Sequence, residues 1–276
     1  MVIIDGKKIA EDILNEIKSE VEKLKFQPIF CDILVGDDPS SVQYVKMKAK
    51  TAERVGMKFL NANYPATIST EDLILEVKKL NAVPNLCGLI MQLPLPESIS
   101  KQEVLDAIDP RIDVDCTGKV NTDLFYKGRA YMRYPTALAV MEALDSLEIN
   151  FERKKFLVVG YGQLVGKPVN YLLEKRRLMV DVARSKTPDI FDLMKKADVI
   201  ISAVGKPNLI TGDKIKPGVV VIDAGTSEAD GGVVGDVQFD SIKDIASFIS
   251  PVPGGVGPVT VAKLLSNVLK VAKMSK

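Results

Sequence analysis

The sequence predicts an α/β protein of two domains, with a parallel βαβ sheet in the N-terminal one and a Rossmann-like sheet in the C-terminal one. Three observations predict this class. Short apolar, β-branched segments alternate with helical patterns along the chain, which is typical of βαβ units. A glycine-bearing turn follows one of these strands in the second half. The 276 residues are enough for two ordinary hydrophobic cores.

In the first half, a short strand and turn at residues 1–8 is followed by alternating helices and strands. Strands are expected at 29–35, 57–63 and 87–93, and helices at 8–24, 39–55, 70–81 and 101–108. A helix at 133–148 is expected to link the two halves.

The second half repeats the pattern. Strands are expected at 155–159, 179–183, 199–203 and 219–223, and helices at 165–176, 188–196 and 259–272. We find no repeat of solenoid period and no low-complexity segment.

Composition excludes several classes of function. The formal net charge is +1, so no general field draws the chain to nucleic acid or to a membrane surface. No apolar run approaches the roughly 18 residues that span a bilayer. The three cysteines lack metal-ligand spacing, so reduced thiols in a cytoplasmic protein are expected, without a metal. Histidine is absent, which excludes imidazole catalysis and leaves Lys, Asp, Glu, Tyr or Cys for proton transfer.

A glycine-rich turn follows the strand at 155–159. The segment Gly160-Tyr161-Gly162-Gln-Leu-Val165-Gly166 connects that strand to a helix. Glycines let a backbone approach a pyrophosphate, and the helix N-terminus offers free N–H groups. The spacing is one residue longer than the usual dinucleotide fingerprint, and such a turn also needs glycine for purely steric reasons. The turn favours a C-terminal domain that binds NAD(P), with steric need as the alternative.

The next strand ends in Arg184-Ser185-Lys186-Thr187. In a dinucleotide fold this point faces the adenosine ribose, where an acidic residue reads the 2′-hydroxyl of NAD. Positive charge and a hydroxyl suit a 2′-phosphate instead, which favours NADP over NAD. The alternative is that Ser185 or Thr187 caps the next helix while the cations are merely solvated.

One lysine in the first half is directed towards the protein interior. Asp38 and Pro39 begin a helix that Gly56 ends, and its apolar stripe is Val42, Val45, Ala49 and Ala52. On a helical wheel Lys48 lies nearer the centre of this stripe than Lys46 or Lys50, and shares its flank with Tyr44. A part-buried lysine can lose its proton and act as a base. The alternative is a lysine whose stem lies on the core edge while its ammonium reaches water.

Three loops are candidates for the same ligand-binding edge. Met91-Gln92-Leu93 ends a buried strand with a polar side chain, and Asp113-Val-Asp115 follows the next helix. Either aspartate could instead be a turn former. The segment from Pro251 to Pro258 is stiff and poor in side chains, which suits a backbone surface for a flat ligand or a rigid turn between domains.

Together these segments resemble one family, the bifunctional methylenetetrahydrofolate dehydrogenase/methenyltetrahydrofolate cyclohydrolases. The resemblance covers nearly the whole chain in family order. The matching segments are Tyr44–Lys48, Gly88–Pro96, Asp113–Asp115, Val165–Pro168, Arg184–Thr187, Ile222–Gly225, Gly235–Val237 and Pro251–Pro258.

The resemblance implies two reactions of one-carbon folate metabolism, which supplies purine and methionine biosynthesis. Hydride passes from 5,10-methylenetetrahydrofolate to NADP⁺, and water then converts the methenyl product to 10-formyltetrahydrofolate. It also implies a folate-binding catalytic domain at 1–136 plus 258–276, a nucleotide domain at 137–257, and a cytoplasmic homodimer formed through the nucleotide domain.

The resemblance also implies roles for individual residues. The catalytic set is Lys48, Gln92 and Asp115, with Gln92 positioning the lysine and Asp115 holding the pterin. The substrate-binding set is Tyr44, Lys48, Met91, Gln92, Leu93, Asp115, Pro253, Gly254, Gly255, Val256 and Gly257. The cofactor-binding set is Gly160, Tyr161, Gly162, Val165, Gly166, Arg184, Ser185 and Thr226.

Several positions depart from the family pattern. The usual Gly-Arg-Ser is Gly160-Tyr161-Gly162, which removes one expected phosphate partner, and Arg184 stands where a histidine is usual. Arg184 is therefore expected to take over the 2′-phosphate. Cys116–Lys119 replaces the usual Gly-Phe-His-Pro, and Pro135–Ala137 the usual Cys-Thr-Pro. These two changes affect the substrate rim.

Other functions remain open on the sequence. One is a different dinucleotide-dependent dehydrogenase on a similar two-domain frame, acting on an amino acid or shikimate. Another is a nucleotide-sensing or folate-binding module without turnover. Loss of one of the two family activities is a third.

Overall fold

The computed structural model describes residues 1–229 and 232–275. The chain divides into two compact units. We call residues 12–135 and 261–276 the three-stranded lobe, and residues 1–11 and 136–260 the six-stranded lobe, after their sheets. The α/β class with two parallel-sheet domains is confirmed. In the described residues, no helix has both the length and the apolar character to cross a membrane.

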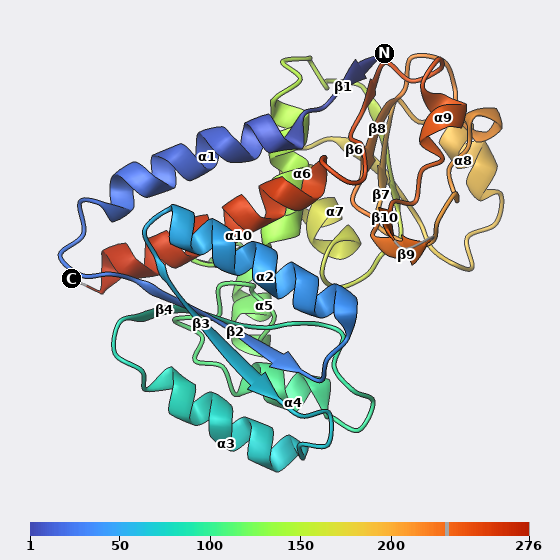
Figure 1. The fold of residues 1–276 in the computed structure, drawn as a ribbon. Helices are drawn as coiled ribbons and strands as arrows, with labels where there is room; N and C mark the ends of the chain where they lie inside the picture. The colour runs from blue at the N-terminus through green and yellow to red at the C-terminus, as the bar shows by residue number, and fades with distance from the viewer. Residues whose placement is uncertain (230–231, 276) are drawn as a thin grey trace. The chain divides into compact units, whose positions relative to one another are not determined.

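The three-stranded lobe is built on a fully parallel sheet in the order β3-β2-β4. Its strands are β2 (Ile29–Val35), β3 (Lys58–Tyr64) and β4 (Leu86–Met91), and its helices are α2 (Pro39–Arg54), α3 (Thr70–Asn81), α4 (Lys101–Asp106) and α5 (Lys119–Tyr126). Helix α2 packs on β2 and β3, and α4 lies beside α3 (Figure 1). The parallel order places the ends of β2 and β4 at one edge, where Gly36 and Gln92 follow them.

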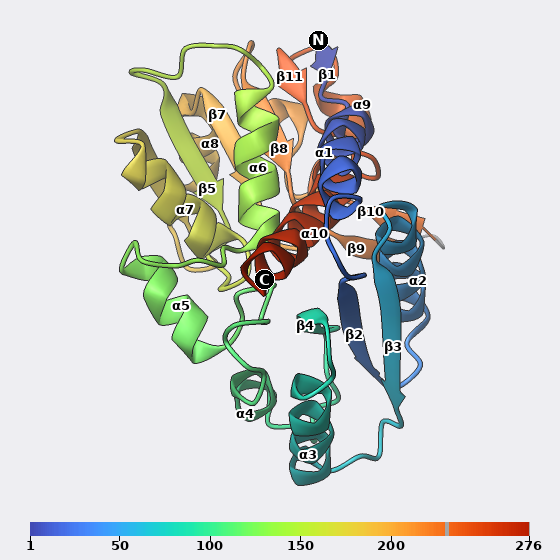
Figure 2. The same cartoon turned by 90° about the vertical axis from the view of Figure 1, so that its left-hand side faces the viewer.

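The six-stranded lobe has a parallel sheet in the order β1-β11-β8-β7-β5-β6. Figure 2 labels β1, β11, β8, β7 and β5 of this sheet. Its strands are β1 (Val2–Ile3), β5 (Lys155–Val159), β6 (Met179–Ala183), β7 (Val199–Ser202), β8 (Val220–Asp223) and β11 (Phe248–Ile249), and its helices are α6 (Pro135–Asp145), α7 (Gly166–Lys175), α8 (Ile190–Lys196), α9 (Phe239–Ile242) and the 3₁₀ turn η1 (Gly212–Lys214). A hairpin of β9 (Ser227–Ala229) and β10 (Gly232–Val234) stands apart from the sheet. The chain order reverses beside β5, which has β6 on one side and β7 on the other.

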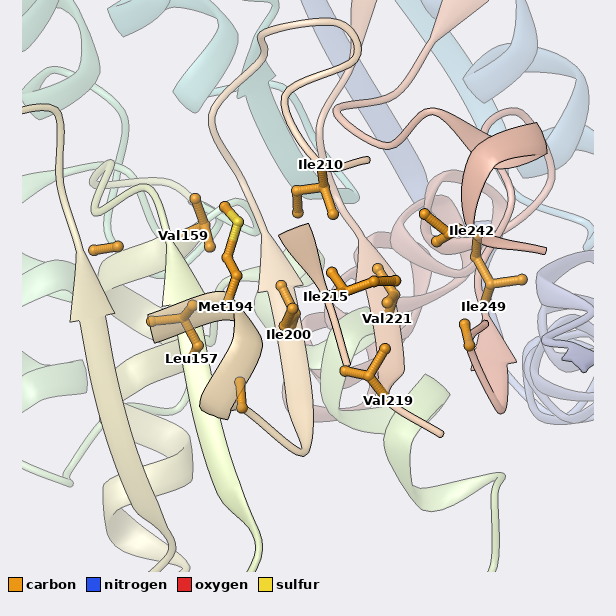
Figure 3. Packing of buried hydrophobic residues seen from close by; sticks show 13 residues of the cluster. Leu157, Val159, Met194, Ile200, Ile210, Ile215, Val219, Val221, Ile242 and Ile249 are labelled. Carbon is orange, nitrogen blue, oxygen red and sulfur yellow. The ribbon is translucent and has the colours of Figure 1, made fainter. Parts of the chain in front are cut away.

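One face of this sheet carries a continuous hydrophobic core (Figure 3). Leu157 and Val159 alternate along β5, and Ile200 and Val221 occupy the same face of β7 and β8. Met194 of α8 packs onto them, so this helix covers that face. Because both faces of a parallel sheet are covered by crossovers, its central strands β5, β7 and β8 are mostly apolar. The binding edge is therefore the row of loops at the strands' carboxyl ends.

The compact units differ from the expected domains at residues 1–11, 136 and 258–260. Residues 1–11 were expected with the folate-binding domain, but β1 pairs in parallel with β11 and extends the six-stranded sheet. The lobe boundaries fall inside α1 (Gly6–Val21) and inside α10 (Val256–Met274). Val2 and Ile3 are too few for a strand pattern, so nothing in the sequence indicates their partner.

Candidate functional site

Helix α2 begins and ends as its sequence predicts. The Asp38 carboxylate accepts a hydrogen bond from the backbone N–H of Ser41 at 2.8 Å, and Gly56 leaves the helix with φ +85°. These ends fix the length of the helix, and the pattern of its side chains decides which face meets the sheet. The buried face consists of Ser41, Val45, Lys48 and Ala52. Lys48 therefore lies on the face of α2 that is turned towards the protein interior.

The Lys48 ammonium group does not reach water, so the alternative of a solvated lysine is wrong. Lys48 is 4% exposed, and its Nζ donates a hydrogen bond to Gln92 Oε1 at 2.7 Å. The same nitrogen lies 2.6 Å from Asp32 Oδ2 and 5.9 Å from the centroid of the Tyr44 ring. The expected group of Tyr44, Lys48 and Gln92 is thus brought together within the three-stranded lobe.

Gln92 is held with its carbonyl oxygen towards the lysine. Its backbone N–H donates to Ile33 O at 2.8 Å, which continues the ladder of β2 and β4 by one residue. Its side-chain Nε2 donates to Leu93 O at 2.7 Å. Because the amide nitrogen is committed to this carbonyl, Oε1 faces Lys48. Met91, buried, is the last residue of β4.

The two aspartates after α4 have different roles. Asp113 is the turn former: its carboxylate accepts from Gly118 N at 3.0 Å, Thr117 N at 3.2 Å and Asn121 Nδ2 at 3.1 Å. Asp113 also lies opposite Leu89 of β4 in a parallel bridge, which directs the segment towards the carboxyl end of that strand. Asp115 follows two residues later. Desolvation, followed by the charge of Asp113, raises the pKa of the Asp115 carboxyl to about 6, and the charge of Lys48 acts against this rise.

Asp32 is a site residue that our sequence analysis missed. It stands in the middle of β2, between Cys31 and Ile33, and is fully buried. Burial raises the pKa of its carboxyl, and the nearby Lys48 charge partly offsets the rise. The available signal was a single charged residue inside an apolar strand, because a buried carboxylate requires a partner.

In the six-stranded lobe, the loops after β5 and β7 approach each other closely. Gly160 has φ +91°, and a Cβ there would lie 2.5 Å from the carbonyl oxygen of Ala203. At Gly166 a Cβ would lie 2.0 Å from the carbonyl oxygen of Gly160. Steric need thus explains both glycines, as the alternative interpretation of this turn held. These loops lie where the strand order reverses, which is where ligands bind in open α/β sheets.

Gly162 is different, because the protein itself does not require a glycine there. A Cβ at this position would meet no atom within 4 Å, and its φ is not in the left-handed region. Gly162 is exposed at the turn that leads into α7, whose N-terminal residue is Gly166, with Val165 as N-cap. Open backbone beside a helix N-terminus fits the pyrophosphate of a dinucleotide.

Arg184 at the end of β6 lies over the Tyr161 ring. The guanidinium carbon is 4.2 Å from the ring centroid. Arg184 and Thr187 form a turn, in which the backbone N–H of Arg184 donates to Thr187 Oγ1 at 2.8 Å. Helix α8 begins after Asp189, which makes no side-chain cap, so neither Ser185 nor Thr187 caps it. The capping alternative is wrong, and an exposed cation remains beside the glycine turn.

Two buried aspartates organise the neighbouring loops, and the sequence analysis gave them no role beyond the family match. Asp236 accepts from Ser202 Oγ at 2.6 Å, Val204 N at 2.8 Å and Lys206 N at 2.7 Å. Asp223 accepts from Gly225 N at 2.9 Å and Val237 N at 3.0 Å. Desolvation, followed by the Asp236 charge, raises the pKa of the Asp223 carboxyl to about 6. The loops after β7 and β8 are thereby fixed.

Thr226 and the proline-rich loop belong to the same lobe. Thr226 is exposed, and its carbonyl oxygen would lie 3.5 Å from a Cβ at Gly205. In the segment Pro253–Gly257, Gly254 has φ +105°. A Cβ on Gly6 would lie 1.8 Å from the carbonyl oxygen of Gly255, so this loop packs directly against the start of α1. A Cβ on Gly255 would lie 2.5 Å from the carbonyl oxygen of Pro251, so packing accounts for this glycine of the loop.

The three cysteines are free and buried. Burial raises the pKa of the Cys31 thiol to about 12 and that of Cys87 to about 11, and it also raises that of Cys116. Thiols in such surroundings are poor nucleophiles. The free thiols agree with the reduced state expected from the sequence, and burial gives them a packing role.

Comparison with known proteins gives matches along the whole chain. Residues 4–115 match the family model described as tetrahydrofolate dehydrogenase/cyclohydrolase, catalytic domain, and residues 134–276 match its NAD(P)-binding domain. The chain is 43% identical to the bifunctional protein FolD of Nautilia profundicola, over 99% of this chain and 98% of that protein.

Two solved structures extend the comparison to the fold. The bifunctional FolD methylenetetrahydrofolate dehydrogenase/cyclohydrolase of Campylobacter jejuni aligns with a TM-score of 0.95 and 37% identity, covering 100% of both chains. The Trypanosoma brucei FolD, complexed with NADP cofactor and inhibitor, aligns with a TM-score of 0.94 and 37% identity, covering 100% of this chain and 98% of that one.

Proposed function

The chain belongs to the tetrahydrofolate dehydrogenase/cyclohydrolase family, and from that premise we propose that NADP⁺ is its oxidant and Lys48 its proton acceptor in hydrolysis. It is a bifunctional methylenetetrahydrofolate dehydrogenase and methenyltetrahydrofolate cyclohydrolase. The first reaction oxidises 5,10-methylenetetrahydrofolate to the methenyl cation, and the second converts that cation and water to 10-formyltetrahydrofolate. The rival dehydrogenases and the binding module are therefore set aside.

The observation that carries the role of Lys48 is its contact with Gln92. The two residues are 44 positions apart, yet Nζ and Oε1 lie 2.7 Å apart inside the lobe. Methenyl hydrolysis requires a group that accepts a proton from water, and the chain has no histidine to do so. Gln92, whose amide orientation is fixed by Leu93 O, positions the amine. Tyr44 is proposed to stack on the folate ring, and Asp115 to accept hydrogen bonds from the pterin.

The remaining substrate contacts are proposed from the family match. They are the end of β4 in the three-stranded lobe, with Met91 and Leu93, and the loop of the six-stranded lobe, with Pro253, Gly254, Gly255, Val256 and Gly257. A loop with so few side chains offers backbone groups to a flat ligand, although packing already accounts for Gly255.

NADP is preferred to NAD in this proposal because of the charge at the end of β6. That position faces the adenosine ribose in dinucleotide folds. The Arg184 guanidinium lies over the Tyr161 ring and is exposed, so its N–H groups can bind a 2′-phosphate, and Ser185 adds a hydroxyl. The open backbone at Gly162 fits the pyrophosphate, with Gly160, Val165, Gly166 and Thr226 around it. When bound, the nicotinamide supplies the hydride acceptor.

One purified sample tests the proposal. Initial rates of nucleotide reduction with methylenetetrahydrofolate are measured with NADP⁺ and with NAD⁺, and hydrolysis of methenyltetrahydrofolate is followed by its loss of absorbance. We expect both activities, with kcat/KM for NADP⁺ at least about ten times that for NAD⁺, since a charge-assisted hydrogen bond is worth about 1.5–3 kcal/mol. A preference for NAD⁺ would contradict the cofactor assignment, and absent hydrolysis the role of Lys48.

We also propose that the protein works in the cytoplasm as a homodimer formed through the six-stranded lobe. Strand β6 stands at the end of its sheet and exposes Met179, so it offers an edge to a second copy. Light scattering at several concentrations tests this proposal, and a monomer at micromolar concentration would contradict it.

A further inference from the structure

Lys48 forms a buried ion pair with Asp32, although a lysine that acts alone as a base would not need a carboxylate partner. Asp32 Oδ2 lies 2.6 Å from Lys48 Nζ, and the two side chains are 0% and 5% exposed. Within residues 1–229 and 232–275, neither carboxylate oxygen of Asp32 accepts a hydrogen bond of regular geometry, and Oδ2 meets Lys48 in the ion pair while Oδ1 has no such partner. A carboxylate in this position is costly, because one of its oxygens is desolvated without compensation.

Stability does not account for the pair. Removing two charges from water offsets most of their attraction, and well-packed apolar residues of similar size often serve as well or better. Phe30 and Leu34, two residues to either side of Asp32 and thus on the same face of β2, are buried apolar side chains. An apolar residue at position 32 would continue this pattern. The carboxylate at position 32 is therefore explained by the chemistry of Lys48 and not by the stability of the strand.

An ammonium group cannot accept a proton from water until it has lost one. Lys48 Nζ has two close partners, Asp32 Oδ2 and Gln92 Oε1. An amide oxygen is far too weak a base to take a proton from an ammonium, whereas a carboxylate can. Of these two partners, only Asp32 can make Lys48 a base while Lys48 remains inside its ion pair.

We propose that Asp32 is the positioning residue through which Lys48 works in hydrolysis, receiving a proton from the ammonium as the ammonium receives one from water. This inference rests on the proposed role of Lys48. As the water oxygen bonds to the methenyl carbon, the π electron pair of the C=N⁺ bond moves onto nitrogen. One water proton passes to Nζ, and one Nζ proton passes to Asp32 Oδ2.

The charges balance in this step. The folate loses one positive charge, and the pair changes from ammonium and carboxylate to ammonium and carboxylic acid. The resulting hydroxyl intermediate then opens to the formyl product by breaking one C–N bond, with the hydroxyl proton moving to the released nitrogen. Asp32 returns its proton through Lys48 to solvent, so each turnover releases one proton.

Three other titratable groups interact with the pair. Asp115 is coupled to both Lys48 and Asp32, and its own pKa is raised to about 6. Tyr44, on α2, has a raised pKa because of burial and the Asp115 charge. Cys31, the neighbour of Asp32 on β2, has a pKa raised to about 12. Tyr44 and Cys31 thus stay neutral at neutral pH, while Asp32, whose pKa is raised by burial, is prepared to accept a proton.

The test is the pH profile of hydrolysis in Asp32→Asn. General acid–base groups contribute about 10²–10⁴-fold, so we expect kcat at pH 7 to fall at least about 100-fold, with a small change in the KM for folate. The rate should recover as the pH is raised, because an amine alone must then accept the proton. NADP⁺-dependent dehydrogenation in the same sample, which needs no such acceptor, should stay within about 3-fold of wild type.

Controls separate this idea from its premise. Cys31→Ala truncates the neighbouring buried side chain and should leave the pH profile unchanged. If Lys48→Met retains hydrolysis, the proposed role of Lys48 fails. If Lys48→Met loses hydrolysis while Asp32→Asn keeps it at pH 7, or gains it at lower pH, only the role of Asp32 fails. A parallel loss of both activities in Asp32→Asn would make Asp32 a structural residue and also overturn the proposal.

A second measurement uses the wild-type enzyme and needs no variant to fold. Hydrolysis rates in mixtures of H₂O and D₂O report how many protons move in the rate-limiting step. Two protons in flight, from water to Lys48 and from Lys48 to Asp32, predict a curved dependence on the deuterium fraction. A straight line means that one proton moves and overturns the relay.

Discussion

Gly162→Ala separates a glycine that the fold needs from one that a ligand needs. The structure leaves open space around a Cβ at this position, and its backbone dihedrals suit alanine. We therefore expect the free energy of unfolding, measured without nucleotide, to fall by less than about 0.5 kcal/mol. It is even expected to rise, by about 0.4–1 kcal/mol, where alanine makes the unfolded chain less flexible. Nucleotide affinity should nevertheless fall.

The size of that loss follows from close packing. A methyl group forced into a fitted contact costs about 1–3 kcal/mol, which corresponds to a roughly 5- to 150-fold weaker Kd. The pyrophosphate is common to both nucleotides, so NADP⁺ and NAD⁺ should lose affinity equally. Methenyl hydrolysis, which uses no nucleotide, should be unchanged. Calorimetric titration gives the affinities, and denaturant unfolding gives the stability.

Gly160→Ala is the matched contrast within the same turn. Its φ of +91° and the Ala203 carbonyl oxygen 2.5 Å from the added Cβ should cost at least about 2 kcal/mol of unfolding free energy. If Gly162→Ala binds NADP⁺ as tightly as wild type, the backbone at Gly162 is not a cofactor contact. If it unfolds as readily as Gly160→Ala, Gly162 serves the fold and the reasoning is refuted.

Three further predictions follow from single contacts. Arg184→Ala should weaken NADP⁺ about 10- to 100-fold and NAD⁺ less than about 2-fold in equilibrium titrations, and equal losses would contradict the 2′-phosphate role. The pKa of Asp115 is about 6, so this carboxyl takes up a proton as the pH falls through 6, and the KM for folate should rise. Asp115→Asn should lack this pH dependence. A wild-type KM that is flat from pH 5 to 7 would refute the assignment. Asp236→Asn leaves one N–H or O–H donor without an acceptor and should cost about 1–3 kcal/mol in denaturant unfolding, whereas an unchanged midpoint would mean that these hydrogen bonds contribute nothing.

Sequence periodicity predicted the larger elements because each buries one face. The helix at Pro39–Arg54 carries its own start signal in Asp38-Pro39, and its stripe also predicted which lysine is buried. The strand Lys155–Val159 is apolar and buried after its first residue, as expected between two neighbours. Such signals lie within a few residues of the element they define.

Features that depend on distant partners could not be predicted in this way. Helix α5 (Lys119–Tyr126) contains Asn, Thr and Asp, which are poor helix formers, and its N-cap, Gly118, has no side chain with which to cap the helix. The pairing of β1 with β11 joins opposite ends of the chain. Asp32 was visible as an anomaly in its strand, but only the folded structure shows that its partner is Lys48.

Methenyl hydrolysis by Lys48→Met tests the account most directly, because methionine keeps the length of the side chain without the amine. With dehydrogenation and nucleotide affinity recorded on the same preparation, we predict at least a 100-fold loss of hydrolysis (about the contribution of one acid–base group) and wild-type NADP⁺ binding. Hydrolysis at the wild-type rate would contradict the claim that this amine takes the proton from water.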